Sequence, residues 1–301
     1  MKSVHVFASL LAIALCPVFP AHAQCELGEP VTTPVTFAGN DRIPVITGTV
    51  NRQAFRFKLH SSDSASTLNR AAAEKLGLEV NKRSTNYDGV DVLTTFTDKV
   101  TAGAVSRAGE FVVHDNKSTL YDGELGGAML FRLDVELAFA DGYIKQSKPS
   151  GCFRTFLATW DPKATVVTFT NHAGRGDLRP WFWVSINGTP ILSTIATEEP
   201  YTMVDAKTAA RLGLTDDMPG AHDAGEVISW RDKVQKVSTV PADVAIGNYH
   251  DKTATVRIFD MDLSGEMMVL GADFLRANRV LVSTSQQKLY ITPLKARMFA
   301  D

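Results

Sequence analysis

Two short segments of the chain carry the side chains best suited to acid–base chemistry. Both combine hydroxyl groups with titratable groups, and they read His60-Ser61-Ser62-Asp63 and Ala196-Thr197-Glu198-Glu199. Two carboxyl groups that approach closely can share a proton, so that one activates a water while the other donates to a carbonyl oxygen. Asp63 with Glu198 or Glu199 would supply such a pair if the fold brought the two segments together.

A serine nucleophile is the other chemistry that the first segment suggests. His60 and Ser61 are neighbours in an expected strand, so their side chains point to opposite faces, and Ser62 falls where a turn is expected. No Gly-x-Ser-x-Gly motif is present, which disfavours a serine hydrolase. The remaining histidines lack metal-ligand spacing, and no phosphate-cradling glycine loop appears. We therefore expect neither a metal nor a cofactor.

The two segments occupy equivalent places in an internal repeat. Residues 50–78 run in register with residues 186–214 at an offset of 136, and residues 125–135 match residues 270–280 at an offset of 145. A repeat of this kind predicts two similar lobes with a cleft between them. A shorter match, residues 95–100 with residues 229–234, places Phe96 and Trp230 in equivalent hairpins.

Most of the chain is patterned as strands. The segment Phe55-Arg56-Phe57-Lys58-Leu59 alternates apolar and polar residues, as a half-buried strand does. Short helices are expected before Gly77 and before Gly213, which supply stop signals, and Asp205 is a candidate cap for the second helix. The prediction is a mainly β protein with few helices.

The first 23 residues have the pattern of a secretory signal. Lys2 is followed by an apolar run at residues 6–19 and by the small-x-small site Ala21-His22-Ala23. A lipoprotein signal fits less well, because Gln24 stands before Cys25 where a small residue is expected. We expect export to the periplasm or the outside of the cell, and no membrane span in the mature chain.

The expected export decides whether the cysteines pair, and the net charge limits which partners we expect. In an oxidising compartment Cys25 and Cys152 are expected to pair, with two free thiols as the alternative. The formal net charge of −2 gives no electrostatic reason to propose nucleic acid as a partner. The pattern sets no oligomeric state.

On several ordered motifs the chain resembles the pepsin/retropepsin-type aspartic proteases in their bacterial exported form. The family has a strand ending in Asp-Thr/Ser-Gly, a short helix ending in Leu-Gly-Leu, a flap hairpin, and later a hydrophobic-Gly strand with a helical turn. Here Leu-Gly-Leu recurs at residues 76–78 and 212–214, and the late elements match at Leu125-Gly126, at residues 269–275 and at the tail 287–293. The resemblance covers residues 35–294.

This resemblance implies a bilobal acid-protease fold of two homologous β-barrel-like lobes. The divisions would be a signal peptide at residues 1–23 and lobes at residues 24–152 and 153–301. The Asp-Thr/Ser-Gly motifs fall on His60-Ser61-Ser62 and Ala196-Thr197-Glu198, so neither keeps its aspartate. Both keep the middle hydroxyl, Ser61 and Thr197, which in the family holds the two loops together.

The first functional hypothesis is a catalytically inactive pseudoprotease that binds an extended peptide or protein segment in its cleft. Phe96 and Trp230 would lie in flaps, either closing over that segment or packing on their own lobes. The second is an active endopeptidase that uses a shifted pair, Asp63 with Glu198 or Glu199. The third is a structural interaction domain of the cell envelope.

Overall fold

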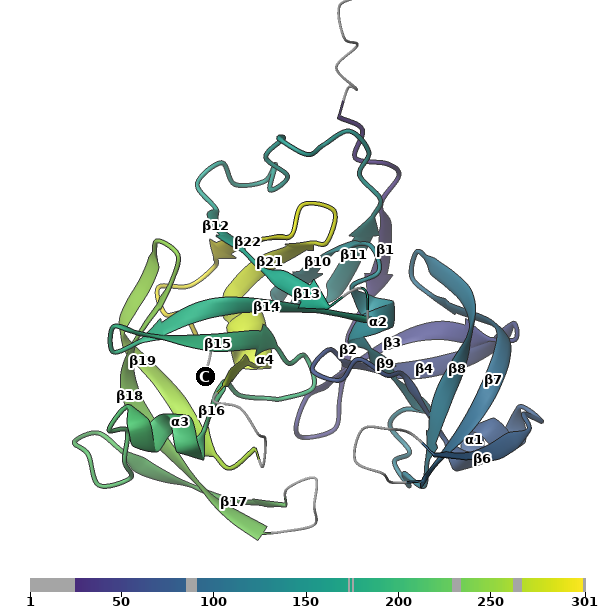
Figure 1. Cartoon of the computed structure of the whole chain (residues 1–301), viewed down its shortest axis with the longest axis horizontal. Helices are drawn as coiled ribbons and strands as arrows, with labels where there is room; N and C mark the ends of the chain where they lie inside the picture. The colour runs from purple at the N-terminus through teal and green to yellow at the C-terminus, as the bar shows by residue number, and fades with distance from the viewer. Residues whose placement is uncertain are drawn as a thin grey trace, which may run out of the picture.

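The computed structural model describes residues 25–84, 91–172, 174, 176–228, 234–261 and 267–299. The expected signal peptide and Trp230 lie outside these residues. Within them the protein is mainly β, as predicted, with three sheets and short helices. Figure 1 shows two β lobes, blue to teal and green to yellow, with a third sheet lying across both.

The first lobe is built on an eight-stranded sheet with the order β2-β3-β4-β9-β5-β8-β7-β6. Its strands are β2 (Thr36–Ala38), β3 (Ile43–Val50), β4 (Gln53–His60), β5 (Thr67–Asn69), β6 (Val80–Ser84), β7 (Asp91–Ala102), β8 (Val105–His114) and β9 (Gly123–Gly126). Two short helices accompany them, α1 (Arg70–Lys75) and α2 (Gly127–Leu130).

The second lobe repeats this sheet, strand for strand, in the order β13-β14-β15-β20-β16-β19-β18-β17. Its strands are β13 (Thr170–His172), β14 (Asp177–Ile186), β15 (Thr189–Ile195), β16 (Met203–Asp205), β17 (His222–Ile228), β18 (Val234–Ile246), β19 (Tyr249–Phe259) and β20 (Met268–Leu270). The helices are α3 (Ala206–Arg211) and α4 (Ala272–Ala277).

A six-stranded sheet joins the two halves of the chain in the order β1-β11-β10-β21-β22-β12. Its strands are β1 (Val31–Pro34), β10 (Asp134–Ala138), β11 (Tyr143–Ser147), β12 (Thr165–Thr168), β21 (Asn278–Ser283) and β22 (Lys288–Pro293), with the short 3₁₀ helix η1 (Phe139–Asp141) after β10. The halves meet where β10 pairs with β21, with Leu137 opposite Val280.

Strand pairing confirms the two long segments of the sequence repeat. Leu59 lies opposite Leu125 in the first lobe, as Ile195 lies opposite Leu270 in the second. The shorter repeat match is wrong, because Val100 and Val244, not Val234, occupy equivalent places opposite β3 and β14. The true equivalence could not be read from a six-residue match, since β17 and β18 differ in length from β6 and β7.

The structure confirms the predicted helix stops, the helix cap and the disulfide. Gly77 and Gly213 follow α1 and α3 with φ of +65° and +67°, the left-handed conformation that a glycine stop adopts at little cost. The Asp205 carboxylate accepts a hydrogen bond from Lys207 N at 3.0 Å and so caps α3. Cys25 and Cys152 form the predicted disulfide, which ties the start of the first half to its end.

Among the residues that the structure describes, no helix has the length and apolar character that crossing a bilayer requires.

Candidate functional site

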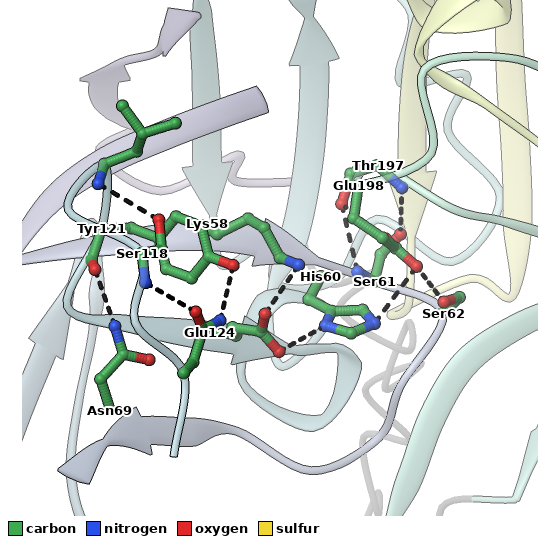
Figure 2. A network of polar contacts seen from close by, with 12 residues as sticks. Lys58, His60, Ser61, Ser62, Asn69, Ser118, Tyr121, Glu124, Thr197 and Glu198 are labelled. Atoms are coloured by element: carbon green, nitrogen blue, oxygen red, sulfur yellow. Dashed lines mark hydrogen bonds and ion pairs between the residues drawn. The ribbon is translucent and has the colours of Figure 1, made fainter. Parts of the chain in front are cut away.

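The two chemistry-bearing segments meet where β4 and β15 end. Ser61 N donates to Thr197 Oγ1 at 3.1 Å, and Thr197 N donates to Ser61 Oγ at 2.9 Å. The Ser61 hydroxyl also donates to Ile195 O at 2.6 Å. Ser61 and Thr197 are both completely buried, so water cannot replace these bonds. The hydroxyls therefore link the two lobes by reciprocal hydrogen bonds (Figure 2).

An arginine adds a second tie between the lobes. Arg179, on β14, donates from its guanidinium to Ser62 O at 2.5 Å. Asp177 holds the same guanidinium through hydrogen bonds of 2.9 and 2.8 Å from Nε and Nη2. A two-point arginine–carboxylate pair fixes the plane of the guanidinium, so the turn after His60 is held in place from the other lobe.

His60 lies between two glutamates that come from different lobes. Its Nδ1 is 2.7 Å from Glu124 Oε2, and its Nε2 is 3.4 Å from Glu198 Oε1. Lys58 lies two residues earlier on the same face of β4, with its Nζ 2.6 Å from Glu124 Oε1. Figure 2 shows the resulting chain from Lys58 through Glu124 and His60 to Glu198, which also accepts a hydrogen bond from Ser62 Oγ.

The charges of the network formed by Lys58, Glu124, His60 and Glu198 favour one protonation state of its members. Burial alone would lower the pKa of His60, but the charge of Glu198 and the hydrogen bond with Glu124 outweigh it and raise that pKa above its ordinary value. Burial would raise the pKa of Glu124, yet the hydrogen bond from His60 and the charges of His60 and Lys58 lower it to about 2. The favoured state is therefore an imidazolium between two carboxylates.

Glu199 follows Glu198 and lies beside this charged network. Its backbone closes a turn, donating to Ala196 O at 3.2 Å and accepting from Ala272 N at 2.7 Å. Within the described part of the chain its carboxyl group makes no hydrogen bond or ion pair. Burial, followed by the charge of Glu198, raises its pKa to about 7.

Asp63 lies on an exposed turn. Its carboxylate accepts a hydrogen bond from Ala65 N at 2.9 Å, two residues along the chain. Its backbone oxygen accepts from Gly127 N at 2.6 Å, which fastens the turn to the start of α2. The structure thus brings His60, Ser62 and Glu198 into contact, while the Asp63 side chain stabilises its own turn.

The second lobe has no counterpart of the charged chain. The residue equivalent to Glu124 is Val269, since each pairs with the matching strand, Glu124 with Thr67 and Val269 with Met203. Ala196 stands where His60 stands in the first lobe, and it is completely buried in a small apolar cluster with Met261 and Val269. The titratable groups at this junction are therefore supplied by the first lobe and by the turn after Thr197.

Two members of the chain, Lys58 and Glu124, were not anticipated from the sequence. The alternation of β4 did place Lys58 on the same face as His60, which was a usable signal. Glu124 precedes the recognised Leu125-Gly126 pair, but only the parallel pairing of β4 with β9 brings it beside His60.

The predicted flap aromatics are only partly described. Phe96 lies within β7, opposite Glu110, and its side chain is 62% exposed. It therefore does not pack into its own lobe. Trp230 lies outside the described residues.

Comparisons with known proteins do not assign the chain. No protein-family model matches it, and no curated protein matches it in sequence. Across the described residues, no group of three or more histidine, cysteine, aspartate or glutamate side chains is arranged to hold a metal ion.

We predict that His60→Gln lowers the free energy of unfolding by about 1.5–3 kcal/mol at pH 5, the usual contribution of a hydrogen bond to a charged group. Because folding raises the pKa of His60, its stabilisation is complete below the ordinary value of 6.5 and is lost as the pH rises through the raised value. Urea unfolding across this range should show the two proteins converging at high pH. His250→Gln, at an exposed ion pair with Asp243, is the control; an equal effect there would contradict the prediction.

Proposed function

We propose that this chain is an exported pseudoprotease of the pepsin/retropepsin-type aspartic protease fold, which binds an extended peptide or protein segment without cleaving it. The segment would lie between the two lobes. The proposal rests on the junction between the lobes, where Ser61 and Thr197 exchange hydrogen bonds. The positions that precede these two residues hold His60 and Ala196. The bonds that align two loops are present, and a pair of catalytic aspartates is not.

The chemistry of these positions argues against aspartic proteolysis. A methyl group at Ala196, enclosed by Met261 and Val269, neither takes nor gives a proton. His60 is engaged on both ring nitrogens by Glu124 and Glu198. A general base must have a free site facing the water that it activates, and His60 has none in this arrangement.

The sheet edges supply a means of binding extended chains. β6 and β17 are the last strands of their eight-stranded sheets, and each pairs on one side only in the described part of the protein. A terminal strand presents backbone N–H and C=O groups that an extended peptide can pair with, and this binding requires no catalytic side chain. The two edges are equivalent in the two lobes.

The direct test is to incubate the purified protein with a pool of random peptides from pH 3 to pH 8. We expect no cleavage at any pH, and we expect hydrogen–deuterium exchange to slow in β6 or β17 when peptides bind. The strands β4 and β15, which pair on both sides inside the two sheets, serve as internal controls. Unchanged exchange throughout, with every peptide intact, would contradict the binding proposal and favour a structural interaction domain.

One observation favours a second function, an endopeptidase with a shifted acid pair. Glu198 and Glu199 are adjacent carboxyl groups, and burial raises the pKa of Glu199 to about 7, so that this carboxyl group keeps its proton near neutral pH, as a general acid must. The matched variant carries Asp63→Asn, Glu198→Gln and Glu199→Gln. Cleavage by the wild type that this variant loses would establish the endopeptidase and overturn the pseudoprotease.

A further inference from the structure

A pocket in the second lobe is lined by two arginines, a histidine and two aspartates. It has a volume of about 270 Å³ and lies between the Tyr201-Thr202 segment, the strands β17 to β19 and the residues 297–299. His222 lies opposite Thr239, and Thr239 lies opposite Arg257, so these three residues form one row across three strands. Directly opposed residues of antiparallel strands share a face of the sheet. Arg297 lines the same pocket from the chain's C-terminal segment.

The carboxylates of the pocket are already satisfied by neighbouring groups. Asp273 accepts hydrogen bonds from Thr202 N and Oγ1, both at 2.8 Å, and from Phe274 N at 2.7 Å. Asp251 accepts from Met298 N at 2.8 Å and from Thr253 N at 2.9 Å. Their oxygens are therefore committed to holding the backbone around the pocket.

The charge of Arg297 helps to lower the pKa of Asp251, after the hydrogen bonds that this carboxylate accepts, but the two arginines are not tied to carboxylates of the described residues by short contacts. The guanidinium carbon of Arg257 lies 3.2 Å from the centre of the Tyr201 ring, a cation–π contact that does not consume an N–H donor. Neither Arg257 nor Arg297 forms an ion pair with a carboxylate in the described part of the chain. A guanidinium presents donors in a fork that matches the two oxygens of a carboxylate or phosphate.

We infer that this pocket binds an oxyanion, a carboxylate or phosphate group, between Arg257 and Arg297, with the Thr239 hydroxyl and His222 completing the site. The anion accepts from both guanidinium groups, and it enters from solvent at the open side of the pocket. This site is separate from the junction at Ser61 and Thr197, and it stands whether or not the protein is a pseudoprotease.

Isothermal titration calorimetry tests the proposal with inorganic phosphate and with acetate, each against sodium chloride at equal ionic strength. We expect heat of binding for at least one of the two anions. Phosphate alone would identify a phosphate site, acetate alone a carboxylate site, and both would show that the fork accepts either. Arg257→Gln or Arg297→Gln should weaken binding roughly 10-fold or more, as expected for a lost hydrogen bond to a charged group.

The matched control is Arg107→Gln, on the exposed face of β8 in the other lobe. It should bind as the wild type does. If Arg257→Gln fails to fold, Arg297→Gln carries the test, because its side chain is exposed in the C-terminal segment. Absence of binding by the wild type at millimolar anion, or binding unchanged in both pocket variants, would overturn the inference.

Discussion

Replacing both buried hydroxyls, with Ser61→Ala and Thr197→Val together, is expected to lower the free energy of unfolding by about 4 kcal/mol. The two variants remove the acceptors for Ser61 N and Thr197 N and the donor for Ile195 O. All of these groups are buried, and a buried polar group left without a partner costs about 1–3 kcal/mol. The loss falls on the junction itself, because these bonds connect the lobes directly.

Urea unfolding at pH 7 measures this loss, with each single variant alongside the double. Thr101→Val is the matched control, since its hydroxyl bonds only to Ser106 at an exposed site. There the change should stay within about 0.5 kcal/mol, as is usual for surface positions. A double variant no less stable than this control would show that the reciprocal bonds contribute nothing to the junction.

Glu199→Gln is expected to stabilise the protein by about 3 kcal/mol at pH 8 and to leave its stability unchanged at pH 4. Folding raises the pKa of Glu199 from 4.5 to about 7, first through burial and then through the charge of Glu198. The folded state therefore resists ionisation. Between pH 4.5 and about pH 7 the free energy of unfolding of the wild type falls progressively, by about 1.4 kcal/mol per pH unit. A glutamine remains neutral and avoids this penalty.

The measurement is the free energy of unfolding of both proteins at several pH values between 4 and 8. Glu226→Gln, an exposed glutamate of β17, is the control and should leave the pH dependence unaltered. A stabilisation of equal size at every pH would show that the carboxyl charge of Glu199 is not its cause. Glu199→Gln also serves the peptide-cleavage test. If Glu199 belonged to an active acid pair, this variant would lose cleavage activity although its fold is more stable.

Three of the groups with a shifted pKa at the junction, His60, Glu124 and Glu199, stabilise the protein most in the same range of pH. His60 contributes fully below 6.5, Glu124 contributes fully above its ordinary value of 4.5, and the penalty from Glu199 is absent below 4.5. The junction is therefore best satisfied near pH 5. It weakens as the pH rises above 6.5 through the raised pKa of His60 and as Glu199 loses its proton near pH 7, and it weakens toward pH 2 as Glu124 is protonated.

The sequence by itself determined the repeat, and with it the pairing of the two segments. A constant offset between residues 50–78 and 186–214 fixes which strands correspond, since each lobe must bury the same alternating face. The glycine stops after α1 and α3 and the cap at Asp205 were equally local. The pairing of Cys25 with Cys152 followed because these two cysteines remain once the expected signal peptide, which contains Cys16, is removed.

Only the tertiary structure decided what surrounds His60. Glu124 is 64 residues away along the chain, and it reaches His60 through a parallel strand pairing whose register no local pattern specifies. Glu198 comes from the other lobe. From the sequence alone His60 has no identifiable partner. In the folded protein it is an imidazolium between the carboxylates of Glu124 and Glu198. Burial and charge at a lobe junction depend on contacts distant in sequence, and those contacts set the pKa values on which function rests.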